Sequence, residues 1–153
     1  MAVAIRIYSS GAPEVMQLEE LDLPSPGPGE VLLEQTAIGV NPLDVNQRKG
    51  LVPIALPSGL GLEGAGTVAA VGSGVSGLKS GDRVGYATGP QGAYASARLF
   101  PADRLIRLPD SLADDAAASV LFKGITAQYL LKTTGQVSQD SRVLIYGAAG
   151  ALG

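Results

Sequence analysis

The chain has 153 residues, of which 46% are hydrophobic and 16% are charged, with a formal net charge of −3. This composition is too apolar for a disordered chain, and the sequence lacks the basic clusters typical of nucleic-acid-binding proteins. The apolar runs are short and interrupted by glycine or proline, so no membrane span is predicted. Residues 1–7 do not have the pattern of a signal peptide, and a cytoplasmic location is therefore expected.

The sequence contains no cysteine and no histidine. Disulfides, a thiolate nucleophile and histidine acid–base catalysis are therefore excluded from this stretch of chain. Zinc sites built from carboxylates alone are rare, so no metal site is predicted. The 21 glycines and 10 prolines favour turns and short strands over long helices.

Short strands separated by glycine-rich and proline-rich turns dominate the first part of the chain. A short helix is predicted at residues 42–49, with Pro42 near its first position and Gly50 after its end. The regular alternation of short strands and turns predicts a compact β barrel or sandwich. The predicted strands are residues 2–8, 15–23, 30–38, 64–71, 82–87, 93–99 and 105–108.

The pattern changes after Pro109. Ser111 is the predicted N-cap of an alanine-rich helix, with Asp114 and Asp115 suited to its first turn. A second helix is predicted at residues 124–134, followed by a buried strand at 141–146. An all-β part followed by helices and a strand predicts two domains, which we divide into residues 1–122 and 123–153.

A glycine-rich turn follows the predicted strand at residues 147–153. Such a turn can place backbone N–H groups against a pyrophosphate at the start of the next helix. The register Ala148-x-Gly150-x-x-Gly153 is an alanine-for-glycine variant of the dinucleotide-binding fingerprint, although tight packing alone accounts equally well for such a turn. The candidate pyrophosphate-binding residues are Ala149, Gly150, Ala151, Leu152 and Gly153.

Several longer blocks carry a family resemblance. They include A-I-G-V-N-P-L-D (37–44), L-P-S-G-L-G-L-E-G-A-G-T-V (56–68), V-G-S-G-V-S-G-L-K-S-G-D-R-V (71–84), G-A-Y-A (92–95) and A-A-A-S-V-L-F-K-G-I-T-A (116–127). In this order and spacing they resemble the quinone oxidoreductase (zeta-crystallin-like) branch of the medium-chain dehydrogenase/reductase family. The resemblance covers nearly the whole chain.

This resemblance implies a mostly β, GroES-like barrel followed by helices and the first strand of a Rossmann α/β domain. It identifies the chain as an N-terminal fragment, inactive by itself, of an enzyme that is a homodimer when full length. The implied cofactor is NADPH, with NADH not excluded, and the implied substrate is a quinone or enone. Zinc-dependent members carry cysteine at the position of Asn41 and histidine at that of Leu62, so no zinc is expected here.

The resemblance also assigns residues to the site. Asn41 and Pro42 are expected beside the nicotinamide, where the Asn41 amide can hold a carboxamide or a substrate carbonyl; an ordinary Asn-Pro turn is the alternative. Asp44 is a candidate catalytic residue, or an ordinary helix-end acid. Thr126 is expected to contact the nicotinamide end of the cofactor.

The substrate side is expected at Asn46 and Val52, where related enzymes commonly carry tyrosines. Val52 cannot donate a proton, and an enzyme without a protein acid could work if the proton comes from water; the proton donor is left open. Glu63 is predicted to satisfy buried backbone amides. For Lys123 both a solvated and a functional role remain open, and Gly124 is a candidate helix break.

The resulting hypothesis is hydride transfer from NADPH to a quinone or another conjugated carbonyl compound. An enoyl-thioester or alkenal reductase is the alternative enzyme, favoured by the Asn41-Pro42 and Asn46 positions. A non-catalytic cofactor-binding module is the alternative from another class. No nucleic-acid or membrane partner is expected.

Overall fold

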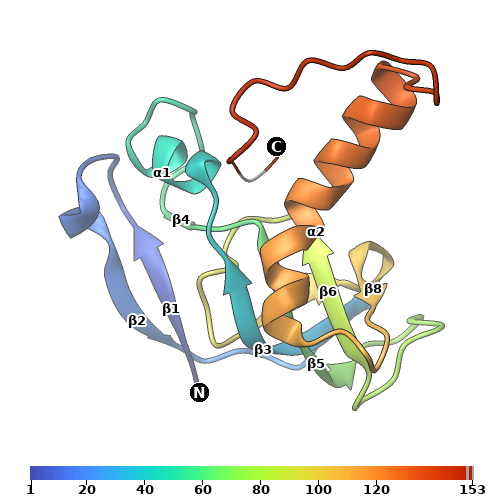
Figure 1. Cartoon of the computed structure of the whole chain (residues 1–153). Coiled ribbons are helices and arrows are strands. Elements are labelled where there is room, and N and C mark those ends of the chain that lie inside the picture. The colour runs from blue at the N-terminus through green and yellow to red at the C-terminus, as the bar shows by residue number, and fades with distance from the viewer. Residues whose placement is uncertain (151, 153) are drawn as a thin grey trace.

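The computed structural model describes residues 1–150 and 152 (Figure 1). Two antiparallel sheets form most of it. The smaller sheet has the order β2-β1-β4, with β1 (Ala2–Ile7) between β2 (Gln17–Leu21) and β4 (Ser58–Gly59). The larger sheet has the order β7-β3-β5-β6-β8. Its strands are β3 (Glu30–Gly39), β5 (Glu63–Val71), β6 (Arg83–Ala87), β7 (Ala97–Pro101) and β8 (Ile106–Arg107).

The predicted barrel is not closed by a continuous ladder of hydrogen bonds. Strand β7 pairs only with Glu30–Glu34, the first half of β3, so the sheet does not continue from there into β1. A single isolated bridge between Ala4 and Ala95 joins the two sheets. The interior between the sheets is nevertheless well packed, and its fully buried residues include Val31, Leu33, Val68, Val84, Tyr86 and Phe100.

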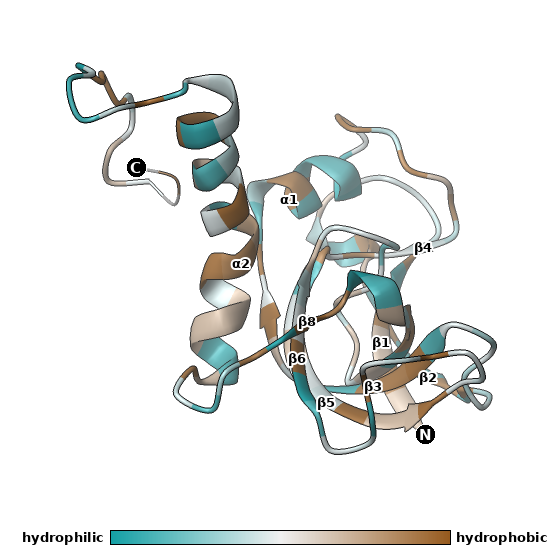
Figure 2. Ribbon diagram, turned by 90° about the vertical axis from the view of Figure 1, so that its right-hand side faces the viewer, coloured by the Kyte–Doolittle hydropathy of each residue, from teal (hydrophilic) through white to brown (hydrophobic). Residues whose placement is uncertain are grey.

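Helix α2 lies along one side of the larger sheet, and α1 lies between α2 and β4 (Figure 2). Helix α1 (Pro42–Arg48) follows β3, and short 3-10 turns occur at η1 (Pro13–Val15) and η2 (Ala102–Arg104). Helix α2 (Asp114–Gln128) packs on β3, β5 and β6 through a small apolar cluster that includes Ala65, Leu108, Ala117 and Ala118. No helix among the described residues is long and apolar enough to cross a membrane.

Two expectations about the helices are wrong. The N-cap of α2 is Ala113 rather than Ser111, and α2 passes through Gly124 without a break into a π-helical segment, η3 (Tyr129–Thr134). An interior glycine costs a helix only about 1 kcal/mol, which the flanking turns tolerate. The proposed domain division between residues 122 and 123 falls inside this continuous helix and stays a prediction.

The strand predicted at residues 141–146 is also wrong. This segment has no ladder partner among the described residues and runs back from the end of η3 toward α1 and α2 (Figure 1). A β-strand exists only where neighbouring strands accept and donate its backbone hydrogen bonds. The apolar sequence of Val143, Leu144 and Ile145 is suited to a sheet, but these side chains are exposed here.

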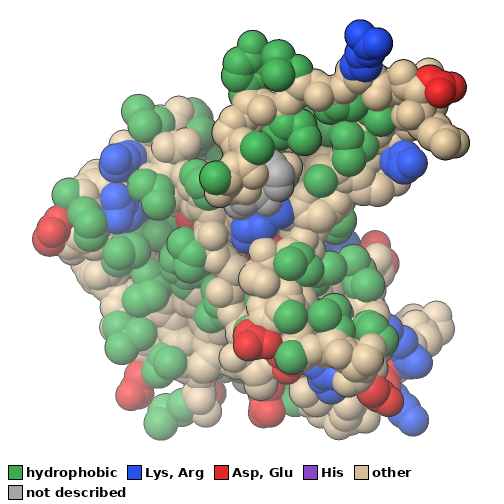
Figure 3. Space-filling model, viewed as in Figure 1, with side chains coloured by type: hydrophobic (Ala, Val, Ile, Leu, Met, Phe, Trp, Pro, Cys, Tyr) green, Lys and Arg blue, Asp and Glu red, His purple; other side chains and the backbone are tan. Residues whose placement is uncertain are grey.

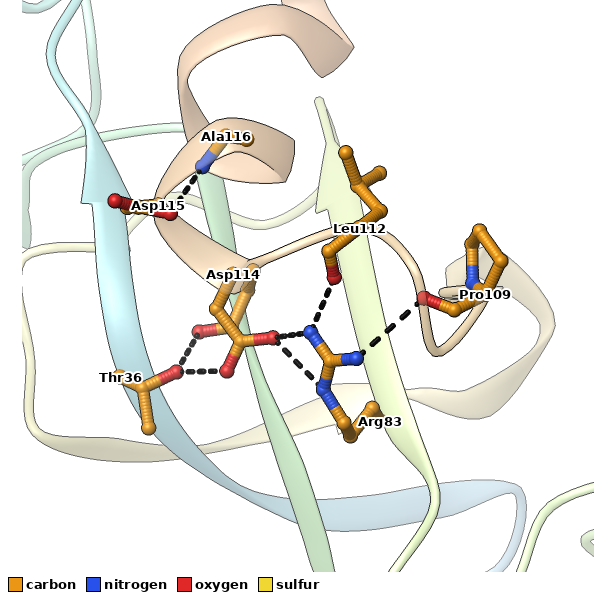
Figure 4. Close-up of polar contacts among 8 residues, drawn as sticks. Thr36, Arg83, Pro109, Leu112, Asp114, Asp115 and Ala116 are labelled. Carbon is orange, nitrogen blue, oxygen red and sulfur yellow. Dashed lines mark hydrogen bonds and ion pairs between the residues drawn. The ribbon is translucent and has the colours of Figure 1, made fainter.

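The start of α2 is attached to the larger sheet by a polar cluster (Figure 4). The Arg83 guanidinium of β6 binds one carboxylate oxygen of Asp114 through two nitrogens and also reaches the Leu112 carbonyl. The Thr36 hydroxyl of β3 donates to the other Asp114 oxygen. Partial burial acts to raise the pKa of Asp114, but the Thr36 hydrogen bond and the Arg83 charge outweigh it and leave this pKa below 3.8.

We expect Asp114→Asn to lower the free energy of unfolding by about 1–3 kcal/mol at pH 7, because it removes a charge-assisted bidentate contact. Since the folded-state pKa is lowered, this stabilisation is present above 3.8 and lost as the pH falls through the folded-state value. Asp115→Asn in the same helical turn is the control, because the one hydrogen bond of the Asp115 side chain among the described residues is from the adjacent Ala116 N–H. Urea unfolding between pH 2 and 7 measures both; equal effects of the two variants would contradict this account.

Candidate functional site

The junction between β3 and α1 positions Asn41. A residue that precedes proline is restricted to an extended backbone, and Asn41 is extended, with Pro42 at the start of α1. The Asp44 carboxylate accepts a hydrogen bond from the Asn41 N–H at 2.9 Å, and the Asp44 N–H donates to the Asn41 carbonyl at 3.0 Å. These local bonds fix Asn41 and Asp44, both buried, at the first turn of α1.

Glu63 joins this junction to α2. It is the first residue of β5, lies opposite Gly39 of β3 and is fully buried. Its Oε1 accepts the backbone N–H of Phe122 at 2.7 Å, whereas Oε2 accepts both Asn41 Nδ2 at 2.9 Å and Lys123 Nζ at 3.0 Å. The prediction that Glu63 satisfies a buried backbone amide is confirmed. The solvated role for Lys123 is wrong, because its side chain is only 18% exposed and paired with Glu63.

Asp44 is a second buried carboxyl beside Glu63. Its Oδ2 accepts a hydrogen bond from the Tyr94 hydroxyl at 2.9 Å, and its buried Oδ1 has no hydrogen-bond partner among the described residues. Burial raises the pKa of Asp44 and the Glu63 charge adds to this, while hydrogen bonds from Asn41 and Tyr94 oppose it without cancelling it. Burial, together with Asp44, raises the pKa of the Tyr94 hydroxyl.

A hollow of about 710 Å³ lies between the α2–η3 helix and the segment that follows it (Figure 3). Five of the predicted site residues line it: Asn41, Pro42, Thr126, Gly150 and Leu152. The Thr126 hydroxyl donates to the Phe122 carbonyl at 2.7 Å. The hollow therefore gathers residues that the sequence places in three separate segments.

Other predicted site residues lie elsewhere. Asn46 and Val52 are adjacent to each other, because the Val52 N–H donates to the Asn46 carbonyl at 3.2 Å, but neither is part of the wall of the hollow. Ala149 is in the glycine-rich turn without lining the hollow, and Ala151 and Gly153 lie outside the described residues.

The glycine-rich turn is tight. Gly147 has a positive φ of 66°, which favours glycine, and the Gly150 N–H donates back to the Gly147 carbonyl at 2.7 Å. That N–H is therefore used within the turn, and no helix follows in the described part of the chain. Pyrophosphate binding by residues 149–153 remains a prediction.

The wall of the hollow combines a hydrogen-bond acceptor with apolar surface, a combination that could hold the nicotinamide end of a dinucleotide. The Thr126 proton is used by Phe122, so its oxygen is available to accept a carboxamide N–H. Phe122, Val143 and Ile145 supply apolar surface for a planar ring. No group of three or more His, Cys, Asp or Glu side chains able to hold a metal ion occurs in the part of the chain that the structure describes.

The fold and the matched sequence define the class. Residues 27–110 match the alcohol dehydrogenase GroES-like domain, and the chain belongs to this family. Its GroES-like, mostly β fold is thereby confirmed, apart from the open sheets and the missing final strand.

Among curated proteins, the chain is 46% identical to a quinone oxidoreductase of Pseudomonas aeruginosa and 43% identical to quinone oxidoreductase 1 of Escherichia coli; each match covers 100% of this chain and 47% of the relative. A 2-haloacrylate reductase of Burkholderia sp. is 43% identical over 100% of this chain and 48% of its own length. The resemblance to quinone oxidoreductases is confirmed. The chain spans about half the length of these relatives.

Solved structures of quinone oxidoreductases are also similar to this chain. A quinone oxidoreductase of Pseudomonas syringae pv. tomato superposes with a TM-score of 0.94 at 44% identity, covering 99% of this chain and 47% of that one. The Escherichia coli quinone oxidoreductase in complex with NADPH superposes with a TM-score of 0.84 at 44% identity, covering 86% and 41%.

We expect Asp44→Asn to change how stability depends on pH. Because the folded-state pKa of Asp44 is raised above 3.8, the stabilisation from this group is present below 3.8 and lost as the pH rises through the folded-state value. The wild type should therefore lose stability relative to Asp44→Asn by about 1.4 kcal/mol for each unit by which the pKa is raised. Urea unfolding from pH 3 to 8 measures this, with the exposed Asp110→Asn as control. A difference that does not vary with pH would refute it.

We expect Gly39→Ala to destabilise the protein by about 1–3 kcal/mol or more, because its Cβ would overlap the Ala118 carbonyl of α2 and the Glu63 carboxylate. Gly124→Ala is a matched control with the opposite sign: no atom lies within 4 Å of its added Cβ, so this variant should gain about 0.5–1 kcal/mol. Thermal unfolding of both variants tests the close packing at Gly39. A neutral Gly39→Ala would show that Glu63 and α2 are not held at this distance.

Proposed function

We propose that the chain is the N-terminal part of a zinc-independent, NADPH-dependent oxidoreductase that transfers hydride to a quinone or another conjugated carbonyl compound. The observation that carries this proposal is that Asn41, Pro42 and Thr126 line one hollow, where the Asn41 and Thr126 side chains are already held by hydrogen bonds. The two relatives named quinone oxidoreductases and the NADPH complex of a similar structure support it.

When bound, NADPH supplies the hydride. The residues of this chain orient it. Glu63 can only accept hydrogen bonds, so its contact with Nδ2 turns the Asn41 amide oxygen away from Glu63 and makes that oxygen available to a carboxamide N–H. Thr126 offers a second acceptor oxygen, and the apolar side chains on the wall limit water near the reacting carbon.

The proposed zinc independence is supported by residue chemistry at the two positions where zinc-dependent relatives are expected to carry ligands. The Asn41 amide nitrogen has no lone pair for a metal and donates to Glu63, and Leu62 is an apolar, buried side chain. Without a metal to polarise a carbonyl, an acceptor that is itself electron-poor, such as a quinone or an enone, is favoured. In the same proposal, Asn46 and Val52 shape the substrate side, Gly150 and its neighbours face the pyrophosphate, and the full-length enzyme is a cytoplasmic homodimer.

Reduction of a conjugated alkene is the second candidate activity. It is favoured by the 43% identity to a 2-haloacrylate reductase, which covers the whole of this chain. The two candidates share the cofactor and differ in the acceptor, so parallel assays with one acceptor of each class separate them.

We expect the protein extended by its native sequence beyond Gly153 to bind NADPH and to oxidise it with 1,4-benzoquinone. Asn41→Ala should lower kcat/KM at least tenfold, since a hydrogen bond that orients the reacting ring is lost. Fluorescence titration and NADPH absorbance measure these, with the exposed Gln139→Ala as the control amide deletion. Turnover of 2-chloroacrylate without quinone turnover would favour the alkene reductase. No oxidation of NADPH or NADH with any quinone or enone would refute the proposed function.

A further inference from the structure

Hydride transfer to a conjugated carbonyl leaves negative charge on the acceptor oxygen, which then takes up a proton. The wall of the hollow offers few protons for this. The Thr126 proton is used by the Phe122 carbonyl, and one of the two Asn41 amide protons is used by Glu63. Tyr146, on the segment opposite α2, is 89% exposed and has no hydrogen bond that would hold it in place among the described residues.

Lys123 is the only charged side chain among the described residues that line the hollow. An ammonium group carries three protons. One of them is directed at Glu63 Oε2, and no other hydrogen-bond partner of Nζ occurs in the described structure.

The position of the ammonium relative to the proposed cofactor site is set by a shared atom. Asn41 Nδ2 and Lys123 Nζ both bind Glu63 Oε2, at 2.9 and 3.0 Å, so the two nitrogens are neighbours. Lys123 and Thr126 are three residues apart in α2 and therefore lie on one face of the helix. The lysine is thus flanked by the two residues proposed to orient the nicotinamide.

We propose that Lys123 is the catalytic proton donor to the reduced acceptor and that Glu63 is the positioning residue that holds its ammonium beside Asn41. This inference rests on the proposed function. It names a protein acid for the proton donor that the sequence leaves open.

The step balances. The acceptor gains a hydride as a C–H bond of the dihydronicotinamide breaks, and the electron pair displaced from the conjugated system collects on an acceptor oxygen. An N–H bond of the Lys123 ammonium breaks as an O–H bond forms at that oxygen. The neutral amine regains a proton from water, which the 18% exposure of the side chain allows. The net reaction consumes NADPH, acceptor and one proton and yields NADP⁺ and the two-electron-reduced acceptor.

The first test removes the amine in the full-length enzyme. Lys123→Ala should lower kcat with 1,4-benzoquinone by roughly 10²-fold or more, the usual effect of losing a general acid. The affinity for NADPH should change less than threefold. Ethylamine in the buffer should restore part of the lost rate, which a purely structural role of Lys123 does not predict. Lys132→Ala on η3, outside the wall of the hollow, is the matched control and should keep the wild-type rate.

Lys123→Arg separates charge from proton donation and covers the case in which Lys123→Ala does not fold. Arginine keeps an ion pair with Glu63 but does not give up a proton. This variant should unfold within a few degrees of the wild type and still turn over at least tenfold more slowly. A wild-type rate in Lys123→Arg would overturn proton donation.

A binding experiment without cofactor provides a second readout. The probe is 4-nitrophenolate, an oxyanion of the same class as a partly reduced quinone, followed by its absorbance. Lys123→Ala should weaken its binding at least tenfold, and Lys132→Ala should not. Unchanged binding in Lys123→Ala would overturn the inference whether or not the enzyme is active. An active wild type with an unimpaired Lys123→Ala would overturn the role of Lys123 alone, whereas an inactive wild type would count against the proposed function.

Discussion

The site depends on one buried carboxylate. A carboxylate that is removed from water is tolerated only where donors surround it, and Glu63 has three, from the β3–α1 junction, the backbone of α2 and the Lys123 side chain. These bonds join the end of a strand, the start of one helix and the middle of another. Shortening or neutralising this side chain would therefore affect Asn41, α2 and Lys123 together, and the bare backbone of Gly39 is what allows α2 to approach so closely.

Helix α2 is fixed to the sheets at two points along its length, and this explains why the wall of the hollow formed by α2 is well defined. Its first turn is bound by Arg83 and Thr36, and Phe122 and Lys123 are bound by Glu63 about two turns later. Beyond that point the helix extends away from the sheets (Figure 1), and its apolar residues Tyr129, Leu130 and Leu131 are exposed. Of the proposed nicotinamide residues, Asn41 is bound to Glu63 at the β3–α1 junction, and Thr126 lies about one turn beyond Phe122 in α2.

The sequence predicts local structure well and long-range contacts poorly. Most predicted strand boundaries agree with the structure to within about two residues, because glycine and proline end the strands. The contact of Tyr94 with Asp44 and that of Lys123 with Glu63 join residues 50 and 60 positions apart, and no local pattern indicates them. The sequence shows Tyr94 in the G-A-Y-A block, but nothing near it indicates a contact with Asp44. The prediction of a strand at 141–146 is wrong although the local sequence is typical of a sheet, because a strand also requires neighbouring strands to pair with.

In the proposed reaction, the hydrogen-bond donors of the hollow would also limit which acceptors can be reduced. An isolated carbonyl places the whole negative charge of hydride addition on one oxygen, which requires a metal ion or several preorganised donors. Apart from the exposed Tyr146 hydroxyl, the side chains of the described wall offer one ammonium, already shared with Glu63, and one unassigned amide proton on Asn41. In a quinone or an enone the charge is delocalised over the conjugated system, so one donor near one oxygen is sufficient. The same scarcity of donors that makes Lys123 indispensable in this scheme therefore favours conjugated acceptors over simple ketones and aldehydes.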